Sequence, residues 1–168
     1  LTGIERKGKV MEVGATTTQS ELEGWSNLKM SLPLLAEAIP NIGHFQTRNR
    51  GTVCGSLCHA DPSSELPTCL TLIGGEIELK NKKRTRRVKA DDFFISVLTT
   101  EKQSDELATK VIFPEVSDGE KYAFTEFCHR HGDFAVVGIA GMSVGNKIKI
   151  SVGGVADKPE VREWDVLE

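Results

Sequence analysis

A glycine- and serine-rich segment followed at once by an apolar run constrains this chain more than any other feature. Residues 48–67 read RNRGTVCGSLCHADPSSELP, and the run LPTCLTLIG begins within them. Gly51 and Gly55 expose bare backbone N–H groups, while Thr52 and Ser56 add small hydroxyls. Such a set suits the close approach of an extended, oxygen-rich ligand. An ordinary tight connection also explains it, so the pattern alone leaves both interpretations open.

Alternating apolar and polar residues predict strands in both halves of the chain. Pro114 ends one strand, and a turn at Asn81 and Lys82 joins two others into a hairpin. The expected strands are KVMEVGA (9–15), EIELK (76–80), RTRRVKA (84–90), LATKVIFP (107–114), KYAFTEFC (121–128), FAVVGIAGMSV (134–144) and KIKISVGGV (147–155). The last three predict a mostly antiparallel sheet in the tail.

Helix start and stop signals predict three helices and one helical turn. The expected positions are Thr18 with Glu21 as a capping box for the first helix, Ser31 with Pro33 to Asn41 or Gly43 for the second, Ser63 or Ser64 to Gly74 for the third, and ADDFF (90–94) for the turn.

Length and charge bound the class of protein. The 168 residues, 39% of them hydrophobic, can bury the core of one domain or of two small ones. EVSDGEK (115–121) is the best boundary candidate. A net charge of −3 gives no field that favours nucleic acid or an anionic membrane. No stretch reaches the length of a membrane span, and the N-terminus has no apolar signal region, so we expect a cytoplasmic protein.

Four cysteines and four histidines raise two other kinds of site. Cys54, Cys58 and His59 could bind a metal, but C-x3-C-H is not a usual zinc spacing and no second pair completes a tetrahedron. A cysteine nucleophile would need a base, and the sequence does not say which histidine is near. The candidate bases are His44, His59, His129 and His131, while Cys69 and Cys128 are expected to be small buried residues.

A basic run, KKRTRR at 82–87, could contact phosphates. On a hairpin its alternate residues would face water, and no aromatic residue interleaves with it. A solvated face is the favoured interpretation.

The segment NIGHFQTRNRGTVCGSLCHADPSSELP resembles the second FAD signature of the flavin-binding subunits of molybdenum hydroxylases. This family includes the medium subunit of aerobic carbon monoxide dehydrogenases and the flavin domain of xanthine dehydrogenases. The segments VMEVGATTTQSELE, ADDFF, DELATKVIFP and FCHRHGDFAVVGIA resemble further family segments in the same order. The resemblance covers nearly the whole chain.

The resemblance implies an α+β fold: a PCMH-type FAD-binding second subdomain, with a mixed sheet and flanking helices, followed by part of a small antiparallel-sheet C-terminal domain. The FAD-binding domain would occupy residues 1–115, and residues 116–168 would be the start of the C-terminal domain. The family's first, glycine-rich FAD loop would precede Leu1. We therefore expect a fragment, natural or trimmed, that lacks the N-terminal FAD subdomain and that is inactive as an enzyme when isolated.

The resemblance also implies cofactor contacts, residue by residue. Thr52 to Ser56 would contact the pyrophosphate and flavin, Glu65 would accept hydrogen bonds from cofactor hydroxyls, and Phe134 would cover one face of the isoalloxazine ring. The implied FAD-binding residues are Ile42, Thr52, Val53, Cys54, Gly55, Ser56, Glu65, Ala108 and Phe134. No residue needs to act as acid, base or nucleophile, and no metal ligand is expected.

Three residues depart from the family pattern: Cys54 stands for glycine, Ser56 for asparagine and Glu65 for aspartate. Cys54 adds a side chain where the backbone needs room, which predicts a shifted loop or an altered flavin environment.

Two functions from different classes follow. The first is a subunit that relays electrons from [2Fe–2S] clusters through FAD to an external acceptor. Its partners would be a large molybdopterin subunit and a small iron–sulfur subunit. The alternative is a truncated, catalytically silent assembly domain that no longer binds FAD.

Overall fold

The first sheet has five strands, and every neighbouring pair in it is antiparallel. The computed structural model describes residues 1–166, and the strand order is β1-β2-β7-β3-β4. The strands are β1 (Ile4–Lys7), β2 (Val10–Gly14), β3 (Glu76–Lys80), β4 (Thr85–Lys89) and β7 (Leu107–Pro114). The expected α+β class is correct, but the sheet is antiparallel and not mixed.

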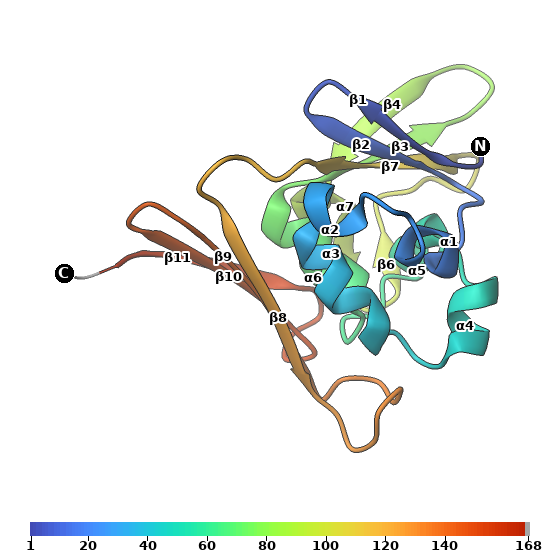
Figure 1. The fold of residues 1–168 in the computed structure, drawn as a ribbon. Helices are drawn as coiled ribbons and strands as arrows, with labels where there is room; N and C mark the ends of the chain where they lie inside the picture. The colour runs from blue at the N-terminus through green and yellow to red at the C-terminus, as the bar shows by residue number, and fades with distance from the viewer. Residues whose placement is uncertain (167–168) are drawn as a thin grey trace.

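The helices gather on one face of this sheet and separate it from the second sheet (Figure 1). They are α1 (Gln19–Glu23), α2 (Leu28–Ser31), α3 (Pro33–Ala38), the 3-10 turn η1 (Ile39–Asn41), α4 (Phe45–Arg50), α5 (Val53–His59), α6 (Glu65–Ile73) and α7 (Ala90–Phe93). Strand alternation explains the arrangement, because Met11 and Val13 of β2 point into the core while Glu12 between them lies on the opposite face of the sheet, where its carboxylate pairs with Lys110. Figure 1 shows the other face of the sheet free of helices.

The second sheet is antiparallel too and is built from the tail of the chain. Its order is β11-β10-β9-β8, from β8 (Lys121–Phe127), β9 (Val137–Val144), β10 (Lys147–Gly153) and β11 (Glu160–Asp165). A small hairpin of β5 (Phe94–Ser96) and β6 (Thr99–Thr100) lies in sequence between β4 and β7, two strands of the first sheet. The last two residues of the expected C-terminal domain lie outside the described residues.

Helix α6 is the element that both sheets share. Eight of its nine residues are buried, so the helix has no solvent face and packs on both sides. It contacts β7 of the first sheet and β9 and β10 of the second. The predicted stop at Gly74 is confirmed, since Gly74 adopts a φ of 67° that favours glycine.

Small residues let the second sheet approach α6 closely. Gly138, Ala140, Ser151 and Gly153 are buried on the face of the sheet that points toward the core. A Cβ atom on Gly153 would collide with Thr68 Oγ1 and lie 3.0 Å from the Pro62 carbonyl oxygen. The chain must therefore carry glycine at this contact.

Several expected elements differ from those observed. The capping box of Thr18 and Glu21 is confirmed in full. Ser31 does not start the second long helix: it ends α2, and Leu32 precedes Pro33 of α3. Strands β1 and β11 and helices α2 and α4 were not expected, because their short or mostly charged sequences carry weak periodicity.

The basic run at 82–87 is only partly a solvated face. Lys82 and Lys83 are exposed, but the guanidinium of Arg86 binds both carboxylate oxygens of Glu106 at 2.8 Å. Glu106 is 2% exposed, and this partner holds the pKa of its carboxyl at about 2. Arg86 thus ties the segment before β7 to β4.

None of the helices described between Leu1 and Val166 combines the length and the apolar character that crossing a bilayer requires.

Replacing Gly153 by alanine should lower the free energy of unfolding by about 1–3 kcal/mol, because the new methyl group overpacks the contact with Thr68 and Pro62. Urea unfolding measures the loss. Gly141→Ala is the matched control, since a Cβ there lies 3.9 Å from the nearest atom, the Ala123 carbonyl oxygen. Equal stability of the two variants would contradict close packing of β10 on α6.

Candidate functional site

The segment expected as an extended loop is the start of a helix. Thr52 is the N-cap of α5, and its hydroxyl accepts a hydrogen bond from the Gly55 N–H at 2.9 Å. Val53, Cys54 and Leu57 are buried on the inner side of the helix. Burial of this apolar side outweighs the weak helix propensity of Gly55 and Ser56, which is why the expected loop was wrong.

The outer side of this helix start leaves main chain accessible. Gly55 is exposed and Ser56 is half-buried. From the replacement of glycine by Cys54 we expected a side chain that takes up room beside the backbone. Cys54 is instead 4% exposed and packs in the core, so its side chain leaves the outer side of the helix start clear. The departure at Cys54 therefore changes the core side of α5 and not its surface.

Two segments that are distant in sequence meet at this point. Thr18 and Thr52 form an antiparallel β-bridge, with hydrogen bonds from Gln19 N–H to the Gly51 carbonyl (2.9 Å) and from Val53 N–H to the Thr17 carbonyl (3.0 Å). Each bridged threonine is also the N-cap of a helix, α1 or α5. The bridge joins the two segments, ATTTQ and GTVCGS, that carried the family resemblance.

The hydrogen-bond pattern leaves a defined donor at the start of α5. Val53 N–H is held by the Thr17 carbonyl, Gly55 N–H by the Thr52 hydroxyl and Ser56 N–H by the Thr52 carbonyl. Among residues 1–166, the Cys54 N–H has no acceptor. The Thr52 hydroxyl accepts one bond and keeps its own proton to donate. An oxygen-rich anionic group fits this donor set.

Two further expected residues belong to elements around α5. Ala108 is a half-buried residue of β7, the strand on which α5 packs. Ile42 is 7% exposed and follows η1. The guanidinium of Arg48 in α4 donates to the Ile42 carbonyl at 3.0 Å. Ile42 thus contributes mainly to the core, and Ala108 packs against the edge of the core cluster.

Glu65 opens α6 and is unusual for a carboxylate, since it is 8% exposed. Burial is the main cause that raises its pKa to about 7, and the nearby carboxylates of Glu126 and Asp61 contribute to this rise. The pKa of Glu126 is also raised by burial, and its Oε2 atom has no hydrogen-bond partner among residues 1–166. Glu65 therefore carries a proton up to near neutral pH and can donate as well as accept.

Phe134 lies in the loop between β8 and β9 and is 70% exposed. A Cβ on Gly132 of this loop would lie 2.6 Å from His44 Cε1, so the loop rests against the start of α4. The ring of Phe134 is free to cover an apolar ligand surface.

The sulfur chemistry considered from the sequence finds little support. Burial raises the pKa of Cys54 to about 12 and also raises that of Cys58, so neither thiol is poised as a nucleophile at neutral pH. Cys69 is fully buried as expected, whereas Cys128 is only partly buried. Within residues 1–166, no three His, Cys, Asp or Glu side chains are arranged to hold a metal ion.

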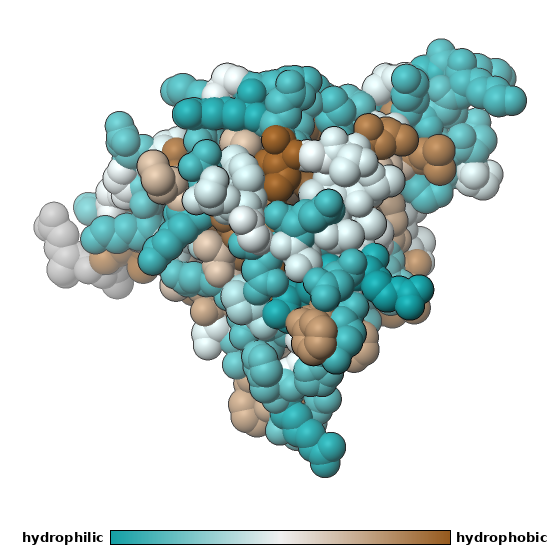
Figure 2. Space-filling model, turned by 45° about the vertical axis from the view of Figure 1, so that its right-hand side comes forward, coloured by the Kyte–Doolittle hydropathy of each residue, from teal (hydrophilic) through white to brown (hydrophobic). Residues whose placement is uncertain are grey.

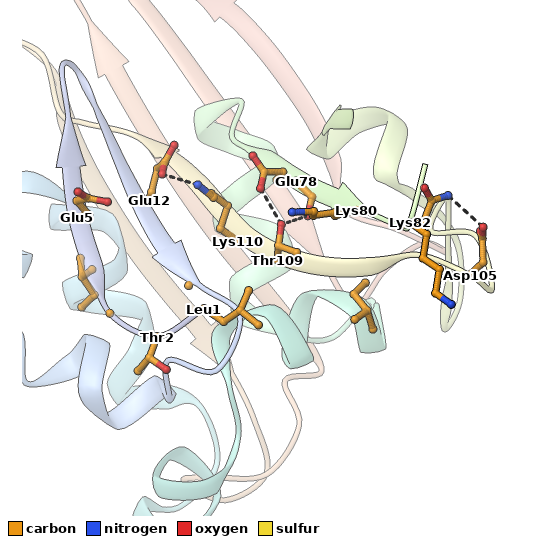
Figure 3. A pocket seen from close by; sticks show the side chains of 15 residues that line it. Leu1, Thr2, Glu5, Glu12, Glu78, Lys80, Lys82, Asp105, Thr109 and Lys110 are labelled. Atoms are coloured by element: carbon orange, nitrogen blue, oxygen red, sulfur yellow. Dashed lines mark hydrogen bonds and ion pairs between the residues drawn. The ribbon is translucent and has the colours of Figure 1, made fainter. Parts of the chain in front are cut away.

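A wide hollow of 1120 Å³ lies on the helix-free face of the first sheet, and none of the expected site residues lines it. Figure 3 shows two side-chain hydrogen bonds in it, from Lys110 to Glu12 at 2.7 Å and from Thr109 to Glu78. The side of the molecule seen in Figure 2 carries hydrophobic residues in small separate spots on a hydrophilic surface. Because none of the expected site residues lines this hollow, it is a weaker candidate than the start of α5 for the ligand that the sequence implies.

A capped helix start with a free main-chain amide is a feature that binds phosphate groups of cofactors. The sequence pattern of the family described as FAD binding domain in molybdopterin dehydrogenase matches residues 1–116, and the chain belongs to this family. FAD is the cofactor that the family assigns to the domain.

Known relatives agree with this assignment. The chain is 37% identical over 154 residues to the glyceraldehyde dehydrogenase medium chain of Sulfolobus acidocaldarius, covering 89% of this chain and 54% of that protein. It is 33% identical over 157 residues to caffeine dehydrogenase subunit beta of Pseudomonas sp. (strain CBB1), covering 93% of this chain and 53% of that protein. The chain thus spans about half the length of these curated relatives.

A solved structure confirms the fold. Reconstituted CO dehydrogenase from Oligotropha carboxidovorans contains a chain that superposes with a TM-score of 0.91 at 28% identity, covering 96% of this chain and 58% of that one. The expected PCMH-type α+β fold is therefore correct.

Sequence reasoning missed the residues that support the site. The capping box of Thr18 was recognised, but its bridge to Thr52 was not, because pairing between distant segments leaves no local pattern. The Arg48–Glu23 ion pair and the Glu65–Glu126 neighbourhood were missed for the same reason.

Replacing Glu65 by glutamine should remove the part of the pH dependence of the free energy of unfolding that comes from the Glu65 carboxyl. In wild-type protein the folded state keeps the Glu65 proton to about pH 7, while the unfolded state loses it near 4.5, so the free energy of unfolding falls as pH rises between these values. The free energy of unfolding of the variant should therefore rise relative to that of wild type as the pH increases from 4.5 to 7. The relative change should be on the order of 3 kcal/mol at pH 7. Urea unfolding at a series of pH values measures the difference, and a difference that does not change with pH would contradict the buried, protonated carboxyl.

Proposed function

We propose that this chain is the FAD-binding part of an oxidoreductase subunit of the molybdenum hydroxylase type. In the complete enzyme it would relay electrons from iron–sulfur clusters through FAD to an external acceptor. The observation that carries the proposal is the start of α5, where Thr52 caps the helix and the Cys54 N–H has no acceptor among residues 1–166, in a chain of the FAD-binding family.

The residues of this chain would bind and orient the cofactor, and bound FAD would supply the redox chemistry. The segment from Thr52 to Ser56 would contact the pyrophosphate and flavin, with the Thr52 hydroxyl and the Cys54 N–H as donors and with Gly55 allowing close approach. Glu65 would hydrogen-bond to cofactor hydroxyls, and Phe134 would exclude water from one face of the flavin ring. Ile42 and Ala108 would form the apolar side of the site.

The domain boundary and the partners are part of the proposal. Residues 1–115 would form the FAD-binding domain, and the second sheet would begin a C-terminal domain at residue 116. The partners would be a large molybdopterin subunit and a small iron–sulfur subunit, since relatives such as the medium chain of carbon monoxide dehydrogenase from Hydrogenophaga pseudoflava are named as one chain of several. We place the complex in the cytoplasm.

Titration of the purified chain with FAD tests the proposal, with quenching of flavin fluorescence as the measurement. The wild-type chain should quench and its melting temperature should rise, since a ligand that binds only the folded state stabilises it. Ser56→Leu adds bulk beside the Cys54 N–H and should weaken binding about tenfold or more.

Thr125→Leu, an exposed position on β8, is the control and should bind as wild type. If the wild-type chain neither quenches nor gains stability, the assembly-domain alternative replaces the proposal. Equal affinity of wild type and Ser56→Leu would move the site away from α5.

A further inference from the structure

Helix α1 contacts the segment that leads into α5 at two points. Gln19 is the first residue of α1 and Glu23 is the last, so their four-residue spacing places both side chains on one face of the helix. The segment they face, from α4 to Gly51, directly precedes Thr52. The short helix α1 therefore contacts the segment before Thr52 both in α4 and at Gly51.

The first contact is an ion pair with additional hydrogen bonds. Arg48 Nε donates to Glu23 Oε2 at 2.9 Å, and Arg48 Nη1 donates to the carbonyls of Ile42 and Gly43 at 3.0 and 3.1 Å. The side chains of Arg48 and Glu23 are 14% and 31% exposed. One guanidinium thus joins α1, α4 and the turn between η1 and α4, where Gly43 adopts a φ of 48°.

The second contact lies under Gly51. Gln19 N–H donates to the Gly51 carbonyl at 2.9 Å, and a Cβ on Gly51 would lie 3.2 Å from Gln19 Oε1 and 3.0 Å from the Thr47 carbonyl oxygen. Gln19 is 4% exposed, and its Oε1 has no hydrogen-bond partner among residues 1–166. An apolar side chain would fill this space without leaving a buried acceptor unpaired, so stability alone does not explain the glutamine.

We propose that Arg48, Glu23 and Gln19 are positioning residues that fix the direction in which the chain enters α5 and so aim the Cys54 N–H. The inference rests on the proposed function for its consequence, but the positioning itself concerns the protein without any ligand. Arg48 would act through Ile42, Gly43 and α4. Gln19 would act through Gly51.

Arg48→Lys is the informative variant. It keeps the positive charge, but a single ammonium cannot reproduce the fixed fork that reaches Glu23 and two carbonyls at once. Backbone amide hydrogen exchange should become about tenfold faster over Gly51–Ser56, while amides of β9 and β10 keep their wild-type rates. Arg162→Lys is the matched control, because Arg162 pairs with Glu160 at 3.5 Å on the surface, with both side chains more than half exposed.

Two substitutions at Glu23 test the same ion pair from its other side, so the inference can still be tested if Arg48→Lys does not fold. Glu23→Gln keeps an oxygen acceptor for Arg48 and should exchange nearly as wild type, whereas Glu23→Leu should resemble Arg48→Lys. Wild-type exchange over Gly51–Ser56 in both Arg48→Lys and Glu23→Leu would overturn the inference. An acceleration shared equally by β9 and β10 would also overturn it, since that result indicates a loss of global stability.

FAD titration of the same variants separates this inference from the proposed function. Arg48→Lys should weaken FAD binding about tenfold with little change in the midpoint of urea unfolding. Faster exchange with unchanged FAD affinity would overturn the positioning role. If the wild-type chain binds no FAD, the proposed function fails, and the exchange rates still decide whether Arg48 and Glu23 position the start of α5.

Discussion

The burial of α6 on all sides is the constraint on which the rest of the structure depends. Because Leu66, Cys69 and Leu70 have no exposed surface, the helix cannot be stable unless an element covers each of its sides. The first sheet covers one side through β7, and the second sheet covers another through β9 and β10. The position of the second sheet, and with it that of the Phe134 loop, therefore follows from the sequence of one short helix.

The candidate site combines a stable base with an accessible surface. The inner side of α5 is part of the core, so Val53 and Leu57 fix the helix on β7, and the outer side can then present main chain without collapsing. The bridge between Thr18 and Thr52 adds a second attachment and brings two helix caps together. Pre-organisation of this kind lowers the ordering cost of binding, because the amides already point in fixed directions.

Local patterns in the sequence predicted local structure well. The strands at 76–80, 107–114, 121–128 and 147–155 and the cap at Thr18 were found because alternation and capping depend on near neighbours. The helix at Val53–His59 was missed, because its stability comes from packing on β7 and not from its own residues. The resemblance to a family supplied the fold class and the expected site residues. Their supports, Arg48 with Glu23 and Gln19 with Gly51, depend on contacts between distant segments and could not be read from spacing.

The place of β7 in the first sheet has a consequence for how the protein is made. This strand pairs with β2 on one side and β3 on the other, and Val10 lies opposite Pro114. A nascent chain emerging from the ribosome cannot join the two halves of the sheet before Pro114 is available. Pairing between segments so far apart in the sequence slows folding, so β7, the strand on which α5 packs, should join the sheet late. Until then, Val53 and Leu57 are exposed to chaperones and to aggregation.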